Sequence, residues 1–168
     1  MFSWEKGRVL DEYQLVFVTR GKGVFQWEDS KPCEVSAGDV MLLRPDMWHR
    51  YKPDAETGWC ENWIGFQGEY AQRLVEKFFT SENALLKVGQ GEELLRKMHV
   101  VIELMRESPA GFRQMMAGET VAALARVRSL AMRADKLLSA YESKMDHARN
   151  YLLAHAAEEI DLKDLAEE

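Results

Sequence analysis

The sequence divides into two parts with different periodicities, and this division limits the fold more than any other feature. All five tryptophans and three of the four prolines come before residue 67. Short runs of β-branched and aromatic residues alternate there with glycine, proline and polar turns, which is typical of a small all-β unit. From Gln67 and Gly68 onward, apolar residues recur three and four positions apart to the end of the chain, which predicts helices. The sequence therefore predicts an α+β fold, in which a barrel or sandwich precedes a helical region.

Several short strands are expected in the first part. Residues 13–20 are rich in β-branched and aromatic side chains and predict the first strand. A glycine-rich turn at residues 21–23 and a returning strand at residues 24–28 would complete a hairpin. The remaining strands are expected at residues 34–39, which include a turn, at residues 40–43 and at residues 58–66.

Two long helices are expected in the second part. Residues 94–105 carry one amphipathic face, and Ser108 with Pro109 closes that helix. Residues 112–133 predict a second helix with a wider apolar arc than one contact with the barrel requires. This arc favours contact with a partner chain, and a helix packed only on its own barrel is the alternative.

The last part of the chain has weaker signals. Residues 134–143 have little periodicity and are interpreted as a linker. Ser143, three residues before Asp146, resembles the capping arrangement at the start of a helix. Asp161 is typical of the cap of one more helix, which begins at residue 162.

Composition and charge exclude several classes of protein. With 46% hydrophobic and 30% charged residues, the chain is typical of a soluble globular protein, and no apolar run approaches the ~20 residues of a membrane span. The first residues lack the features of a signal peptide, so we expect a cytoplasmic protein with Cys33 and Cys60 as reduced thiols. The net charge is −6, and from residue 134 onward nine acidic residues outnumber four basic ones. A surface for DNA must then lie mostly outside this sequence.

Four segments together resemble one family of bacterial transcription regulators. They are the hairpin at residues 13–23, the run AGDVMLLRP at 37–45 with WHRY at 48–51, the strand TGWCENWIGF at 57–66, and IDLKDLA at 160–166. Their order is similar to that of the arabinose-regulator (AraC) family, from a sugar-binding cupin barrel through two dimerisation helices to the first helix-turn-helix unit. The resemblance covers nearly the whole chain.

The resemblance implies both an organisation and a function. It implies a cupin-like (jelly-roll) effector-binding barrel over residues 1–67, a helical dimerisation region over 68–133, a linker over 134–143, and the truncated start of a helix-turn-helix DNA-binding domain over 144–168. The chain would be the sensing part of a regulator of transcription that responds to a sugar or a related small polar metabolite. It would form a homodimer through the second long helix, and operator DNA and RNA polymerase would be partners of the full-length protein only.

Candidate effector-binding residues lie in the barrel. Strand alternation puts Trp59, Glu61 and Trp63 on one face of their strand. The resemblance implies that Glu61, Trp63 and Tyr51 match positions that contact the sugar, and that Arg8 lies in the segment that supplies a basic contact. The alternatives are that Trp63 packs in the core, that Glu61 is a solvated strand residue and that Tyr51 fills the lip of the barrel.

Metal and covalent chemistry are not expected. His49 is the only histidine in the β part, whereas metal-binding cupins bring together two or three histidines and a carboxylate. We therefore expect no metal, no cofactor and no catalytic residue, and His49 is either a hydrogen-bonding residue of the pocket or a structural one. One alternative is a metal-free cupin enzyme, a sugar epimerase or isomerase, with His49 and Tyr51 as acid and base. Another is a dimerisation module whose barrel is filled by side chains.

Overall fold

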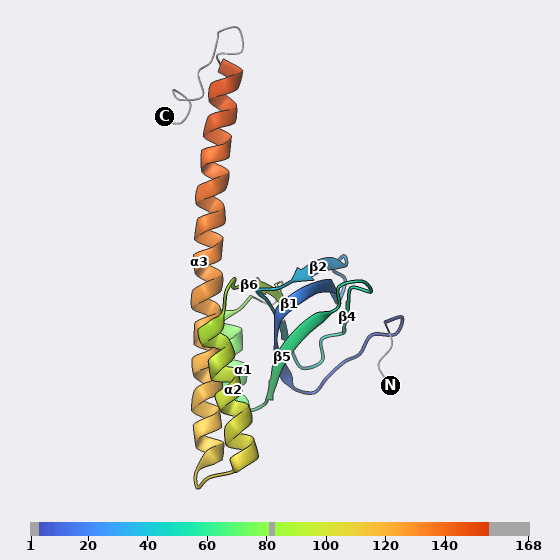
Figure 1. Ribbon diagram of the computed structural model, residues 1–168, viewed down its shortest axis with the longest axis vertical. Helices are drawn as coiled ribbons and strands as arrows, with labels where there is room; N and C mark the ends of the chain where they lie inside the picture. The colour runs from blue at the N-terminus through green and yellow to red at the C-terminus, as the bar shows by residue number, and fades with distance from the viewer. Residues whose placement is uncertain (1–3, 81–82, 155–168) are drawn as a thin grey trace. The chain divides into compact units, whose positions relative to one another are not determined.

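The computed structural model describes residues 4–80 and 83–154. The chain begins with five strands, continues with a helix and a sixth strand, and ends with two long helices (Figure 1). In chain order these are β1 (Tyr13–Trp27), β2 (Cys33–Ser36), β3 (Asp39–Leu43), β4 (His49–Pro53), β5 (Trp59–Phe66), α1 (Glu69–Phe78), β6 (Leu85–Lys87), α2 (Glu92–Glu107) and α3 (Phe112–Ala154).

Strand β1 organises the curled antiparallel sheet, because its two halves pair with different strands. The first half pairs with β3 and β5, and the second half pairs with β2 and β4. The hairpin expected at residues 13–28 is therefore wrong, since one continuous strand passes through the glycine-rich segment. A register shift between Val18 and Arg20 lies where the strand changes partners.

The glycines of that segment bend the strand rather than reverse it. Gly21 has a φ of 78°, and a Cβ atom on it would lie 2.1 Å from the carbonyl oxygen of Gly58. A Cβ atom on Gly23 would lie 2.3 Å from the carbonyl oxygen of Lys52. Only glycine allows β4 and β5 to approach β1 this closely, so the glycines at residues 21–23 mark a close approach of backbones and not a turn.

The two faces of the sheet contribute to two separate cores. In the first half of β1, Leu15 and Phe17 pack against the helices, whereas Val16 and Val18 point into the barrel. The helix side also contains Val40, Leu42, Ile64, Val75, Phe79, Leu94, Met98, Leu124 and Val127. The barrel side contains Phe25, Val35, Met41, Leu43, Met47 and Ala84, with Tyr51 and Trp59 packed against them.

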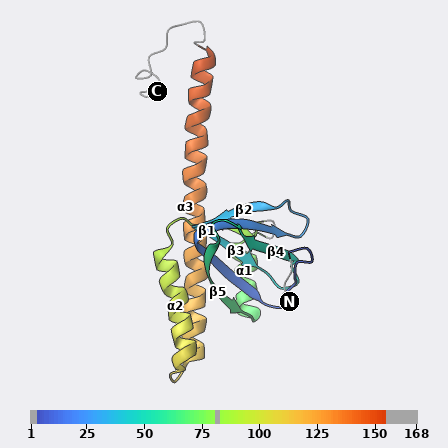
Figure 2. The ribbon, with the colours of Figure 1, turned by 45° about the vertical axis from the view of Figure 1, so that its right-hand side comes forward.

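The helices cover one side of the sheet. Helix α2 lies alongside the first part of α3 in both views (Figures 1 and 2), and ion pairs of Glu93 with Arg126 and of Lys97 with Glu119 join the two. Helix α2 ends at Ser108, which has a left-handed φ of 49°, as the Ser-Pro signal predicted. The expectation that the helical period continues unbroken after residue 67 is wrong, because β6 pairs with β3. This strand is too short to show a period of its own.

Helix α3 is longer than predicted. It continues past residue 133 to Ala154, so residues 134–143 are helical. This segment contains no glycine or proline and includes two alanines and two leucines, so nothing in it ends the helix. The chain divides into two compact units, with the boundary in the sequence between Ala131 and Met132. The helix-turn-helix signal at residues 160–166 lies outside the described residues. No helix within the described ranges is long and apolar enough to cross a membrane.

Candidate functional site

The N-terminal segment pairs with the edge of β4 and brings Arg8 to the barrel. The amide of Arg8 donates to the carbonyl of His49 at 2.9 Å, and the amide of His49 donates to the carbonyl of Arg8 at 2.9 Å. These two bonds form an isolated antiparallel bridge between residues that are 41 positions apart in the sequence. Arg8 is therefore held in place by backbone bonds before its side chain makes any contact.

The Arg8 guanidinium is bound by two of the other predicted residues. Its Nε donates to His49 Nε2 at 3.1 Å, and its Nη2 donates to the Tyr51 hydroxyl at 2.7 Å. The guanidinium carbon also lies 5.2 Å from the centre of the Tyr51 ring, within range of a cation–π contact. Three residues selected from the sequence therefore form one hydrogen-bonded cluster.

His49 acts on Arg8 and is enclosed by the protein. Its side chain is fully buried, and its Nδ1 lies 3.0 Å from the carbonyl oxygen of Met47. Because Nε2 accepts a hydrogen bond from Arg8, the hydrogen of the neutral ring must be on Nδ1, which donates a hydrogen bond to the Met47 carbonyl. Burial lowers the pKa of His49, the bond to Met47 raises it and Arg8 lowers it, with a net shift below 6.5. His49 is thus a neutral positioning residue.

Glu61 brings a carboxylate to the same cluster. Burial raises the pKa of Glu61, while the charge of Arg8 and a hydrogen bond from the Trp59 side chain lower it. Glu61 also raises the pKa of Tyr51, although burial is the larger cause there. Among the described residues, Glu61 Oε2 is the one buried side-chain oxygen or nitrogen without a hydrogen-bond partner. An acceptor in this state is a candidate for a ligand hydroxyl.

The two tryptophans of β5 occupy different environments. Trp59 packs against the barrel core, and its ring lies 5.8 Å from that of Tyr51. Trp63 pairs with the barrel-facing Val16, but its side chain is 53% exposed. The expected alternation along β5 is confirmed, because Ile64 packs on the helix side. Trp59 belongs to the cluster, although the sequence analysis did not name it as a candidate effector-binding residue. Its position on the same face of the strand as Glu61 could have indicated this role.

A strap of aromatic and cationic contacts fixes the segment around Arg8. Arg50 lies over the ring of Trp4 at 4.4 Å and donates to the carbonyl of Trp4 at 3.2 Å. Trp48 Nε1 donates to the carbonyl of Lys6 at 3.0 Å. The Trp48 ring covers Gly7, where a Cβ atom would lie 2.6 Å from the ring and where φ is 65°. Residues 4–8 are called the N-terminal strap below.

The chemistry of the cluster is that of polar recognition. Within the described ranges, no three histidine, cysteine or acidic side chains come together as a metal site. Cys33 and Cys60 are both free thiols. The cluster instead offers a fixed guanidinium, a phenol, a carboxylate with an open acceptor and two aromatic faces. Such groups bind a small ligand that presents hydroxyls and an apolar ring face.

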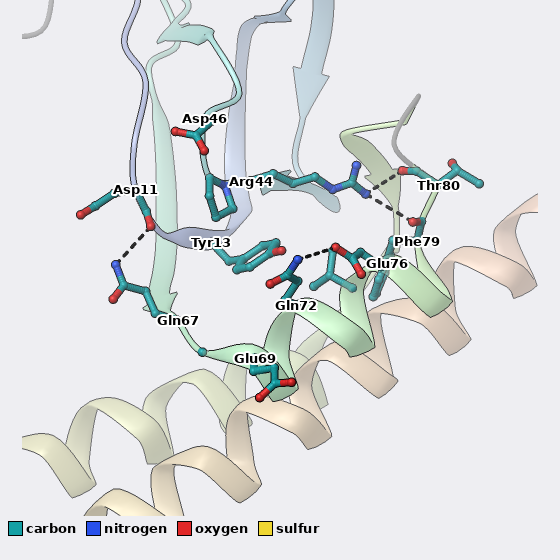
Figure 3. A pocket seen from close by; sticks show the side chains of 13 residues that line it. Asp11, Tyr13, Arg44, Asp46, Gln67, Glu69, Gln72, Glu76, Phe79 and Thr80 are labelled. Carbon is teal, nitrogen blue, oxygen red and sulfur yellow. Dashed lines mark hydrogen bonds between the residues drawn. The ribbon is translucent and has the colours of Figure 1, made fainter.

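A second feature was not predicted from the sequence. A cleft of about 1090 Å³ lies beside α1, and Figure 3 shows its side chains. Tyr13 and Arg44 face it from the sheet side, and Gln72 and Glu76 face it from α1. These residues are far apart in the sequence and share no motif, so no local signal could have identified the cleft.

Comparisons with known proteins agree with the fold. Residues 5–125 match the family described as AraC-like ligand binding domain. The chain is 26% identical over 95 residues to the Msm operon regulatory protein of Streptococcus mutans, covering 56% of this chain and 34% of that protein. It is 26% identical over 163 residues to the MmsAB operon regulatory protein of Pseudomonas aeruginosa, covering 93% of this chain and 50% of that protein.

The matches to the two relatives and to the family model differ in how much of each protein they cover. The chain spans half or less of the length of these two relatives. The family match, in contrast, covers most of the chain and includes the strap from residue 5, the whole curled sheet, α1, α2 and the start of α3. The chain therefore belongs to the family of AraC-like ligand binding domains.

Proposed function

We propose that this chain is the effector-sensing and dimerising portion of a regulator of transcription, and that it binds a sugar or a related small polar metabolite on the barrel side. The effector would contact Arg8, Tyr51, Glu61 and Trp63. The observation that carries the proposal is the Glu61 carboxylate, which has a buried and unpartnered oxygen next to a fixed guanidinium. A buried acceptor without a donor is costly, and a ligand hydroxyl removes that cost.

The proposed ligand chemistry follows from the side chains in reach. A sugar hydroxyl can donate to Glu61 and accept from Arg8 at once, because a hydroxyl has both capacities. The rings of Tyr51 and Trp59 offer flat apolar faces for the C–H surface of a sugar, and the exposed ring of Trp63 can close over it. Each group thus has a separate part in recognition.

Docking of the N-terminal strap on β4 couples effector binding to the conformation of the domain. Arg8 reaches the cluster only while the strap pairs with β4. A ligand that contacts Arg8 therefore binds the docked arrangement more tightly and increases its population. His49 supports this arrangement through Arg8 and has no contact with the ligand in the proposal. Both of its ring nitrogens already have partners, which disfavours His49 as the acid or base of a sugar epimerase.

The proposed homodimer forms through α3. Large apolar side chains remain exposed on α2 and α3, among them Ile102, Met105, Met115 and Met132. Exposed apolar side chains of this size favour association with a second copy. Light scattering at micromolar concentration should then report about twice the 19.4 kDa of the single chain, and a mass near 19.4 kDa would reject the dimer.

The proposed DNA-binding part begins near residue 144. Residues 144–154 are helical, and Met145 and Leu152 are exposed apolar side chains that further helices of a helix-turn-helix domain would cover. In this proposal residues 1–67 form a cupin-like jelly-roll barrel, 68–133 dimerise, 134–143 link the two parts, and 144–168 start the DNA-binding domain. Operator DNA and RNA polymerase are then partners of the full-length cytoplasmic regulator.

A thermal-shift screen tests the effector proposal. The panel contains pentoses, hexoses, uronic acids and short plant-wall oligosaccharides, and tryptophan fluorescence is recorded in parallel. A ligand at 100 times its dissociation constant should raise the free energy of unfolding by about 2.7 kcal/mol. The shift should disappear in Glu61→Gln, which keeps the shape of the side chain and removes its charge. Absence of a shift with every sugar contradicts the sugar assignment.

A further inference from the structure

The cleft beside α1 lies on the opposite side of the sheet from the Arg8 cluster. Tyr13 packs with the helix-side core, whereas Tyr51 packs with the barrel core. The cleft is bounded by the start of β1, by the loop after β3 and by α1, and its volume of about 1090 Å³ accommodates a small metabolite. All of its walls belong to the compact unit that ends at Ala131. It is therefore separate from the proposed effector site.

Tyr13 supplies a buried polar group that faces this cleft. The residue is only 7% exposed, and its ring stacks on Phe66 with the ring centres 5.4 Å apart. Figure 3 shows its hydroxyl pointing toward Gln72 and Glu76. No hydrogen bond to this hydroxyl occurs among the described residues, and its oxygen is accessible from the cleft, since Glu61 Oε2 is the one enclosed side-chain oxygen or nitrogen there without a partner. Burial raises the pKa of Tyr13, and Glu76 raises it further, so the phenol keeps its proton and is a donor.

Arg44 supplies a fixed cation next to Tyr13. Its Nη2 donates to the carbonyl of Thr80 at 2.6 Å and to the carbonyl of Phe79 at 3.5 Å, which ties the guanidinium to the C-terminal end of α1. The side chain is half-buried. Within the part of the chain that the structure describes, its Nε and Nη1 have no partner, so the three N–H groups on these two nitrogens remain for a ligand.

Carboxylates on the other walls make the cleft acidic. Its lining includes one guanidinium, that of Arg44, and four carboxylates, those of Asp11, Asp46, Glu69 and Glu76. The carboxylate of Glu76 accepts from Gln72 Nε2 at 2.8 Å, so it is held in position. This excess of negative charge disfavours phosphates and simple carboxylic acids and favours a ligand that includes a cation. Val75 and Phe79 form an apolar floor.

We propose that this cleft is a second small-molecule site, which binds a metabolite that carries an ammonium group and an oxygen acceptor a few bonds away, as a free amino acid does. The ammonium group lies toward Glu76. The oxygen acceptor receives hydrogen bonds from the Tyr13 hydroxyl and from the free donors of Arg44. The ligand thereby accepts from a hydroxyl that has no partner among the described residues and matches both signs of charge in the cleft.

Fluorine NMR of the chain labelled with 3-fluorotyrosine tests this site. The chain has five tyrosines, and the spectrum of Tyr13→Phe identifies the Tyr13 signal. The twenty standard amino acids are titrated one at a time, each beside the hydroxy acid that lacks its ammonium group. At least one amino acid should move the Tyr13 signal in a saturable way, and its hydroxy acid should bind at least tenfold more weakly. The signal of Tyr70, which is 67% exposed on α1, serves as the internal control.

Substitutions then assign the contacts. In isothermal titration calorimetry, which needs no tyrosine signal, Glu76→Gln and Tyr13→Phe should each weaken binding of that amino acid about tenfold, as loss of a hydrogen bond to a charged group does. Tyr70→Phe should leave the affinity unchanged, and Arg8→Met should leave it unchanged because Arg8 lies on the other side of the sheet. Tyr13→Phe keeps the aromatic ring, and Glu76 is exposed, so both variants should fold. The proposal is overturned if no amino acid moves the Tyr13 signal, or if the hydroxy acids bind as tightly as the amino acids.

Discussion

The two polar sites of this domain lie on opposite sides of one curled sheet and differ in how their groups are held. On the barrel side, Arg8, His49 and Tyr51 bind one another, and only Glu61 keeps an open acceptor. In the cleft beside α1, Tyr13 and Arg44 each keep at least one donor that has no partner among the described residues. A linked cluster fails when one member is removed, whereas independent groups lose affinity one at a time. The predictions below test this difference.

The largest effect is expected from removal of the arginine that joins the barrel cluster. Arg8→Met should weaken binding of the sugar found in the screen by about 2–5 kcal/mol, because it removes a hydrogen-bond donor to Tyr51 and the positive charge that acts on the Glu61 carboxylate. Isothermal titration calorimetry measures the change. Arg20→Met removes an exposed arginine from β1 and is the matched control, which should bind as the unaltered chain does. Equal affinities for the two variants would remove Arg8 from the site.

A substitution in the strap should destabilise the fold without touching the cluster. Gly7→Ala combines a left-handed φ of 65° with a Cβ atom 2.6 Å from the Trp48 ring, so we expect a loss of about 1–3 kcal/mol in the free energy of unfolding. Chemical denaturation measures this loss. Gly118→Ala is the control, since this exposed glycine in α3 has no atom near its Cβ position and should be stabilised by about 0.5–1 kcal/mol. A neutral Gly7→Ala would show that the strap is not docked.

The pH dependence of stability should report the buried histidine. The pKa of folded His49 lies below 6.5, so the unfolded chain takes up a proton first as the pH falls. Stability should then decrease as the pH falls through 6.5, at no more than about 1.4 kcal/mol per pH unit, down to the pKa of the folded state. The decrease should be smaller in His49→Gln than in His99→Gln, which replaces an exposed histidine of α2. Identical slopes for the two variants would contradict a neutral His49.

The smallest effect on stability is expected at the exposed tryptophan of β5. Trp63→Ala should change the free energy of unfolding by less than about 0.5 kcal/mol, because the side chain is 53% exposed. Trp59→Ala should cost about 3 kcal/mol, since that ring packs against the barrel core. A large loss for Trp63→Ala in chemical denaturation would mean that Trp63 has a packing role rather than a ligand role.

Sequence reasoning predicted the elements better than their pairing. The strand at β5 and the end of α2 follow from local alternation and from the Ser108-Pro109 signal. The glycines at residues 21–23 suggested a hairpin because a tight turn and a close approach of backbones both require glycine. The choice between the two depends on Gly58 and Lys52, which are distant in the sequence. Residues 134–143, expected as a linker, are helical. A helix continues through residues of good helix propensity even where their apolar side chains show no helical period.

The candidate site was also predicted only in part, because some of its contacts depend on residues that are distant in the sequence. His49, Tyr51 and Glu61 came from strand positions and from the family resemblance, and the structure brings them together with Arg8. The sequence did not show that both ring nitrogens of His49 are engaged, because that depends on the Met47 carbonyl and on the strap. The cleft was missed because Tyr13 and Glu76 meet only after α1 folds back on the sheet.

The central claim is that the barrel cluster is where the effector binds, and fluorine NMR of the chain labelled with 5-fluorotryptophan tests it most directly. The five tryptophan signals are assigned by single Trp→Phe variants, and the sugar with the largest thermal shift is titrated. We predict that the Trp59 and Trp63 signals move in a saturable way with the same dissociation constant, while the signal of Trp27, which stacks on Phe25, stays in place. Movement of Trp27 alone, or no movement of Trp59 and Trp63 at saturation, would contradict the account.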